Sequence, residues 1–172
     1  LLTQFNLPAN KSFKDFSSGM KMKCKLAVAL SHDPKLLILD EPTSGLDPII
    51  RNEILDIFME YIQNEEKSIF LSSHITGDLE RIADYITFIH DGQIIFTQSK
   101  DDLIDNYGIL KCKKEDYEHL DKNDIVGRRV NQFGFEVLIK NKSSAKNKYG
   151  GAVIDHAGID DIMLFYVKGE RA

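Results

Sequence analysis

Two adjacent carboxylates, Asp40 and Glu41, stand directly after four apolar residues, Leu36–Leu39, and directly before Pro42. A strand that is apolar on both faces is expected to lie between two layers, as in a parallel α/β sheet. Such sheets bind ligands beyond the carboxyl ends of their strands. One carboxylate could therefore face a metal ion while the other acts as a general base. A buried strand followed by an acidic helix-capping turn explains the Asp-Glu-Pro segment equally well.

Two further stretches favour the chemical interpretation. Upstream, Phe16–Lys21 reads Phe-Ser-Ser-Gly-Met-Lys, and its Ser18 stands 23 positions before Glu41. Downstream, Ser72–His74 reads Ser-Ser-His at the end of a second apolar run. Together with the Asp-Glu segment and Ser44–Asp47, these stretches resemble the signature loop, Walker B strand, D-loop and switch-histidine strand of the ATP-binding cassette (ABC) ATPases. The resemblance covers residues 1–100, roughly.

The resemblance implies a role for each matching residue near the carboxylates. Asp40 matches the residue that holds Mg²⁺, usually through water, and a hard cation prefers carboxylate oxygen. Glu41 matches the general base that polarises the attacking water. His74 matches the switch histidine, which contacts the γ-phosphate and can donate a hydrogen bond while neutral. The implied cofactors are therefore ATP and Mg²⁺.

A second group of residues resembles the parts of the family that contact a partner's nucleotide. The signature loop is matched by Ser17, Ser18, Gly19 and Met20, whose hydroxyls and backbone N–H groups would form an anion site at a helix start. Asp47 matches the end of the D-loop, which runs across the dimer interface. The departures from Leu-Ser-Gly-Gly-Gln, at Phe16, Ser18 and Met20, narrow the resemblance to bacitracin-resistance and ABC-2 type exporter cassettes.

Three lysines, Lys21, Lys23 and Lys25, follow the signature segment. Cations in the first turns of a helix oppose its macrodipole, so their placement favours a helix start that faces a polyphosphate. A solvated basic face is an equal alternative for Lys23 and Lys25, which we expect to point away from the loop.

The phosphate loop of an ABC ATPase, G-x-x-x-x-G-K-[ST], is absent from this sequence. The glutamine loop that the family places before the signature is absent as well. The sequence therefore resembles the C-terminal part of a cassette that lacks the Walker A region. We expect it to supply the trans half of a nucleotide site and to be inactive alone.

The helices and strands that would position these residues can be predicted from the periodicity of apolar residues and from capping and turn residues. The sequence predicts the last turns of a helix over 1–6 and Phe13 and Phe16 packed beneath the signature loop. In the first hundred residues it also predicts helices over 19–31, 48–63 (with Asp47 as N-cap) and 76–83, buried strands over 36–39 and 68–72, and a hairpin over 85–97 that turns at Asp91-Gly92. Ser99 is expected to cap a helix ending at 106.

From Tyr107 onward the predicted helices and strands become shorter and alternate more closely. Short strands are predicted over 109–112, 128–132, 135–139 and 152–154, and short helices over 115–120, 143–149 and 159–167. The expected fold class is α/β, a partial P-loop NTPase sheet of the ABC type over residues 1–106. A compact α+β accessory unit follows over residues 107–172, and we expect it to carry no catalytic residue.

The charge and composition of the chain limit the kinds of partner that we expect. The net charge is −5, divided as −7 over residues 1–106 and +2 over 107–172, so no nucleic acid is expected as a partner. No apolar run is long enough to span a membrane, no signal peptide is recognised, and two cysteines fit a reduced cytosolic setting.

The function implied by the resemblance is that of an ATP-hydrolysing ABC transporter subunit, of an exporter. It would lie in the cytoplasm against the inner face of the membrane, with transmembrane permease subunits and a homo- or heterodimeric ATPase partner. Two alternatives remain: a soluble ABC ATPase that acts on ribosomes or DNA, and a catalytically silent interaction module.

Overall fold

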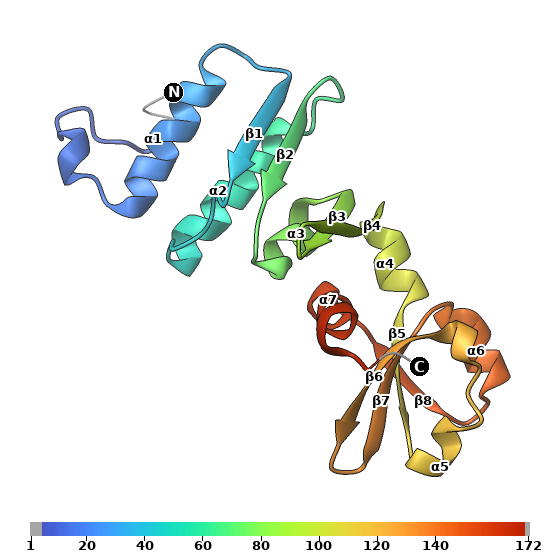
Figure 1. The fold of residues 1–172 in the computed structure, drawn as a ribbon. Helices are drawn as coiled ribbons and strands as arrows, with labels where there is room; N and C mark the ends of the chain where they lie inside the picture. The colour runs from blue at the N-terminus through green and yellow to red at the C-terminus, as the bar shows by residue number, and fades with distance from the viewer. Residues whose placement is uncertain (1–4, 171–172) are drawn as a thin grey trace. The chain divides into compact units, whose positions relative to one another are not determined.

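The computed structural model describes residues 5–170 (Figure 1). The chain divides into two compact units, Leu1–Ile82 and Ala83–Ala172. In the part of the chain that the structure describes, no helix is long and apolar enough to cross a membrane.

The first unit alternates helices and strands and contains one βαβ unit. Its elements are η1 (Phe13–Asp15), α1 (Ser18–Leu30), β1 (Leu36–Asp40), α2 (Pro48–Tyr61), β2 (Ser68–Ser72) and α3 (Thr76–Ile82). Strands β1 and β2 pair in parallel, with Leu36 opposite Ser68 and Asp40 opposite Ser72. Figure 1 shows the two strands side by side, joined through α2. The predicted parallel pairing is confirmed.

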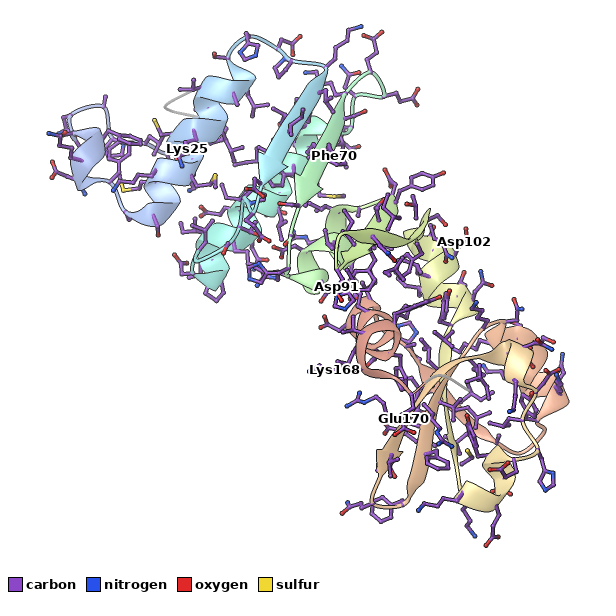
Figure 2. All side chains as sticks on the ribbon, viewed as in Figure 1. Lys25, Phe70, Asp91, Asp102, Lys168 and Glu170 are labelled. Carbon is purple, nitrogen blue, oxygen red and sulfur yellow. The ribbon has the colours of Figure 1, made fainter. Side chains whose placement is uncertain are left out.

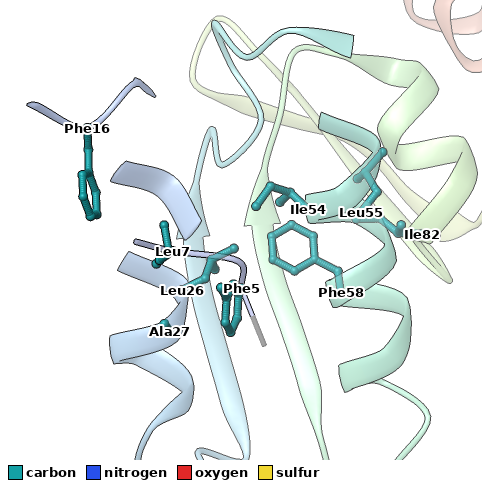
Figure 3. Close-up of a cluster of buried hydrophobic side chains, with 9 residues drawn as sticks. All are labelled: Phe5, Leu7, Phe16, Leu26, Ala27, Ile54, Leu55, Phe58 and Ile82. Carbon is teal, nitrogen blue, oxygen red and sulfur yellow. The ribbon is translucent and has the colours of Figure 1, made fainter. Parts of the chain in front are cut away.

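One face of this two-stranded sheet is covered by α1 and α2. Their buried side chains form a single cluster with the segment before η1 (Figure 3), against which Leu39 and Ile69 also pack. The members of the cluster are Phe5, Leu7, Phe16, Leu26, Ala27, Ile54, Leu55, Phe58 and Ile82. This cluster fixes the sheet relative to both helices, because burial of large apolar side chains is the main favourable term in folding.

The other face of the sheet is open. Leu36, Ile38 and Phe70 are 52%, 72% and 69% exposed, and Phe70 is labelled in Figure 2. The expectation that β1 is covered on both faces is therefore wrong for the residues that the structure describes. The physical reason is that the apolar cluster gathers on one side of a sheet that has only two strands.

Most of the local features predicted for the first unit are observed in the structure. Asp47 is the N-cap of α2, and its Oδ1 accepts hydrogen bonds from the N–H groups of Ile49 and Ile50, both at 3.1 Å. Phe16 is buried as predicted, but Phe13 is 49% exposed, so the prediction that both rings lie beneath the loop is half wrong. The predicted helix over residues 1–6 lies mostly outside the described residues, and positions 5 and 6 form a turn.

The second unit starts with a hairpin. Its strands β3 (Tyr85–His90) and β4 (Gln93–Ser99) are antiparallel. Asp91 and Gly92 have φ values of 48° and 74°, as a two-residue type I′ turn requires. Helix α4 (Lys100–Asn106) follows, with Ser99 as its N-cap. The predicted hairpin and the predicted cap at Ser99 are confirmed.

A β-α-β-β-α-β module completes the second unit. It comprises β5 (Gly108–Cys112), α5 (Lys114–Tyr117), η2 (Lys122–Asp124), β6 (Ile125–Asn131), β7 (Gly134–Ile139), α6 (Lys142–Lys148) and β8 (Val153–His156), before a last helix, α7 (Ile159–Lys168). The strand order is β6-β7-β5-β8 with every pair antiparallel, which is the ferredoxin-like arrangement. The predicted compact α+β unit is thus confirmed in its elements.

The hairpin and the final helix of the second unit pack together. The rings of Phe96 and Tyr166 lie 5.4 Å apart, and the hydroxyls of Tyr107 and Tyr166 are 3.0 Å apart. These contacts explain why the compact unit begins at Ala83. A functional boundary between residues 106 and 107 stays a prediction.

Gly134 offers a test of the second unit. A Cβ at this position would collide with the carbonyl oxygen of Cys112, and its φ of 148° is one that other residues rarely adopt. We expect Gly134→Ala to lower the free energy of unfolding by about 2 kcal/mol or more, measured by urea denaturation. Gly150→Ala is the control, because a Cβ there meets no atom within 4 Å. Equal stability of the two variants would contradict the packing described for β7.

Candidate functional site

The carboxyl ends of β1 and β2 bring polar side chains to one edge of the sheet. The Ser72 hydroxyl donates a hydrogen bond to Oδ1 of Asp40 at 2.5 Å. It also accepts one from the N–H of Glu41 at 3.1 Å, and the Ser72 carbonyl oxygen lies 3.1 Å from the same N–H. One serine of β2 therefore orients both acidic residues that follow β1.

Glu41 has an unusual backbone conformation for a residue with a side chain. Its φ is 47°, in the left-handed region, and it stands directly before Pro42. Residues held in that region cost about 1–3 kcal/mol and persist where surrounding contacts determine them. Such strain tends to occur at functional sites.

The Glu41 carboxylate meets the imidazole of His74. Its Oε2 lies 2.7 Å from Nδ1 of His74, and the two side chains are 35% and 68% exposed. His74 belongs to the segment between β2 and α3, so the contact joins the ends of both strands. The expectation that Asp40 and His74 reach the same edge is confirmed as geometry, while their chemical roles stay predictions.

The residues of the proposed signature loop form the start of α1. Ser17 is the N-cap, and its Oγ accepts a hydrogen bond from the N–H of Met20 at 3.2 Å. Gly19 is buried against α2, where a Cβ would lie 2.6 Å from Cγ2 of Ile50. Ser17 and Ser18 are exposed. Among residues 5–170, no hydrogen bond or ion pair links this helix start to Asp40, Glu41 or His74.

The three lysines of α1 do not behave alike. Lys25 is exposed, as expected for a solvated face, and it is labelled in Figure 2. Lys23 is buried and forms an ion pair with Glu53 of α2, so the expectation that it points into solvent is wrong. The physical reason is that α1 lies against α2, where a long aliphatic stem can be covered while its ammonium finds a carboxylate.

The proposed D-loop leads from β1 into α2. Leu46 donates its N–H to the carbonyl oxygen of Thr43 at 3.3 Å, and Gly45 has a φ of 69°. Asp47 ends the loop as the cap of α2. The structure therefore shows a capping role for Asp47, and a role at a nucleotide stays a prediction.

The sequence analysis did not identify the hydrogen-bonded network of Asp78, Thr43 and Arg51, which lies beside this edge. Asp78 of α3 is 2% exposed and binds both Thr43 and Arg51. The only signal was the position of Asp78 in the first turn of a helix, where an acidic residue is ordinary. Ser72 was noted as part of the Ser-Ser-His segment, without the double hydrogen bond that it makes.

The residues present fit a magnesium ion that is shared with a phosphate ligand. No cluster of three or more His, Cys, Asp or Glu side chains suited to a metal occurs within the described part of the chain. Mg²⁺ does not need one, because it keeps several waters and binds through one or two carboxylates plus substrate phosphates. Asp40 offers one exposed carboxylate that Ser72 holds in place.

Comparisons with known proteins agree with this α/β architecture. A family model described as "AAA domain, putative AbiEii toxin, Type IV TA system" matches residues 9–77, which include the segment from Ser17 to His74. A solved dimeric post-hydrolysis state of an ATP-binding cassette, bound to ADP and Pi, superposes with a TM-score of 0.51 at 21% identity. That match covers 57% of this chain and 43% of the cassette. The matched part of this chain therefore has the fold of part of an ABC ATPase cassette.

Two relatives have informative names. A Mycoplasma pneumoniae protein named "Putative ABC transporter ATP-binding protein" is 39% identical over 150 residues, which cover 79% of this chain and 43% of that protein. The bacitracin transport ATP-binding protein BcrA of Enterococcus faecalis is 44% identical over 85 residues, covering 49% of this chain and 28% of BcrA. The homologues of this chain are thus ABC transporter ATP-binding proteins, of whose length it spans less than half.

The contribution of the two hydrogen bonds of the Ser72 hydroxyl can be tested by measuring the free energy of unfolding. We expect Ser72→Ala to lower the free energy of unfolding by about 1 kcal/mol, because Asp40 and the Glu41 N–H both lose a partner. Ser68→Ala is the control at the other end of β2. Its hydroxyl makes no hydrogen bond within residues 5–170. Urea denaturation of both variants measures the difference, and equal midpoints would contradict the role of Ser72.

Proposed function

We propose that the protein carrying this chain is the ATP-binding and ATP-hydrolysing subunit of an ABC transporter that exports its substrate. The observation that carries the proposal is the 2.7 Å contact between Glu41 and His74 beside Asp40, at the carboxyl edge of two parallel strands. A general base must lie within reach of the water that it activates, and this edge is where such sheets bind ligands. The names of the homologues support the same conclusion.

Each residue at the edge has a distinct task in this proposal. Asp40 holds Mg²⁺, which when bound neutralises charge on the phosphate oxygens. Glu41 orients the attacking water and accepts its proton. His74 contacts the terminal phosphate, and because an ionised carboxylate can only accept, its Nδ1 carries the proton shared with Glu41.

The start of α1 and the D-loop serve a second nucleotide. Ser17, Ser18, Gly19 and Met20 would contact the ATP of a partner ATPase subunit, identical or different, through hydroxyls and backbone N–H groups. Asp47 would lie along that dimer interface. Transmembrane permease subunits would anchor the dimer at the cytoplasmic face of the membrane. Residues 107–172 would tune dimerisation or coupling.

The role of Glu41 is tested by Glu41→Gln in the full-length protein. We expect unchanged ATP affinity and a loss of turnover of about 10²–10⁴-fold, because the amide cannot accept the proton. A nucleotide-bound dimer should accumulate, which size-exclusion chromatography with Mg-ATP would detect.

The matched control is Glu60→Gln, at an exposed position of α2. It removes the same charge away from the edge and should leave turnover unchanged. If Glu41→Gln retained more than half of the parental turnover, Glu41 would not be the base.

The 172-residue chain by itself should show negligible ATPase activity. It contains the carboxylate edge but no phosphate loop, and positioning of the phosphates supplies most of the catalysis in this class of reaction. Release of phosphate from Mg-ATP by the purified chain measures this. Steady turnover that Glu41→Gln abolishes would show the expectation to be wrong.

A further inference from the structure

A buried carboxylate joins three separate elements next to the catalytic edge. Asp78 of α3 accepts a hydrogen bond from Oγ1 of Thr43 at 2.5 Å. Its other oxygen accepts from Nε of Arg51 at 2.6 Å and lies 2.5 Å from Nη2 of the same guanidinium. Asp78 and Thr43 are each 2% exposed. A buried carboxylate with these partners is fixed in place, because losing either one leaves a charge or a hydroxyl unpaired.

Two members of this network, Thr43 and Asp78, lie close in sequence to the two proposed catalytic residues, Glu41 and His74. Thr43 follows Glu41 by two residues, and Asp78 follows His74 by four. The loop after Glu41 is tied closely to it, because Ser44 donates its N–H to the carbonyl oxygen of Glu41 at 3.2 Å. Arg51 connects both to α2, the helix that the loop enters.

The left-handed backbone of Glu41 needs support from both sides. On the strand side, Ser72 holds its N–H. On the loop side, the side chain of Thr43 is the residue anchored in the interior, through Asp78. A strained conformation persists only where the surroundings determine it, and these two anchors flank the strained residue.

We propose that Thr43, Asp78 and Arg51 form a positioning clamp that sets the Glu41 carboxylate against His74. The clamp touches no substrate atom, so its members act through Glu41 and His74. This inference rests on the proposed function, because it assigns the clamp a part in hydrolysis beyond stability.

The same helix pair offers a natural comparison. Arg81 of α3 donates to Oδ1 of Asp56 at 2.5 Å and to Oδ1 of Asn52 at 2.9 Å, both on α2. This network also joins α2 to α3, yet within residues 5–170 it forms no hydrogen bond or ion pair with the loop after Glu41. A substitution at Asp56 therefore reports on loosening of the helix pair without loss of the loop anchor.

The test uses the full-length protein with Thr43→Val, Thr43→Ser and Asp56→Asn. Valine keeps the shape of threonine and removes the hydroxyl, whereas serine keeps the hydroxyl. Since a misplacement of about 1 Å can cost about 100-fold in rate, we expect Thr43→Val to lower kcat by at least about tenfold. KM and the Kd for Mg-ATP should change little, because the clamp itself contacts no atom of the nucleotide.

The rescue and the control should separate positioning from stability. Thr43→Ser should restore kcat to at least half of the parental value. Asp56→Asn should leave kcat near the parental value even where its unfolding midpoint falls as far as that of Thr43→Val. If Thr43→Val fails to fold, Arg51→Lys takes its place, since lysine keeps the charge but loses the planar fork. Arg51→Lys should then lower kcat without raising KM.

Three results would overturn the clamp: an unchanged kcat in Thr43→Val, a serine variant as slow as the valine variant, or an equal loss in Asp56→Asn. An unchanged kcat in the substitute Arg51→Lys would do the same. A parental protein whose turnover responds to Glu41→Gln but not to Thr43→Val refutes the clamp alone. A parental protein without Glu41-dependent turnover refutes the proposed function and the clamp with it.

Discussion

The parallel register of β1 and β2 is the constraint on which the candidate site depends. It places Asp40 directly opposite Ser72, so that one hydroxyl reaches a carboxylate and a backbone N–H at once. Parallel pairing is set by the apolar cluster under the strands and by the crossover through α2. A slip by one residue would turn every side chain of β2 to the opposite face, and would remove Ser72 from Asp40.

Much of this arrangement could be predicted from the sequence because the signals are local. Asp47 before Pro48 predicts a helix start, and Asp91-Gly92 predicts a tight hairpin, since each depends on neighbouring backbone groups. The segments that resemble the ABC ATPases predicted that Asp40 and His74 reach the same edge of the sheet, although no local pattern gives the distance between Glu41 and His74. That distance follows from the pairing of two strands far apart in the chain.

The errors and omissions share a physical cause, which is that burial depends on tertiary neighbours. Lysine is a residue type that is usually exposed to solvent. In this structure the packing of α1 against α2 covers Lys23 and brings Glu53 to its ammonium group. Asp78 looks like an ordinary acidic residue of a helix start until Thr43 and Arg51 are seen around it. The open face of β1 was missed because an apolar run states what can be buried and gives no information on what covers it.

That open face has a practical meaning for the chain as a molecule in solution. Leu36, Ile38 and Phe70 lie next to one another on paired strands and expose apolar carbon to water. Contiguous apolar surface of this kind attracts other apolar surfaces. The 172-residue chain should therefore bind a dye such as ANS in its folded state and associate more strongly in sulfate than in dilute buffer. Three side chains that have no part in the proposed chemistry would then contribute to the association of the chain with other surfaces.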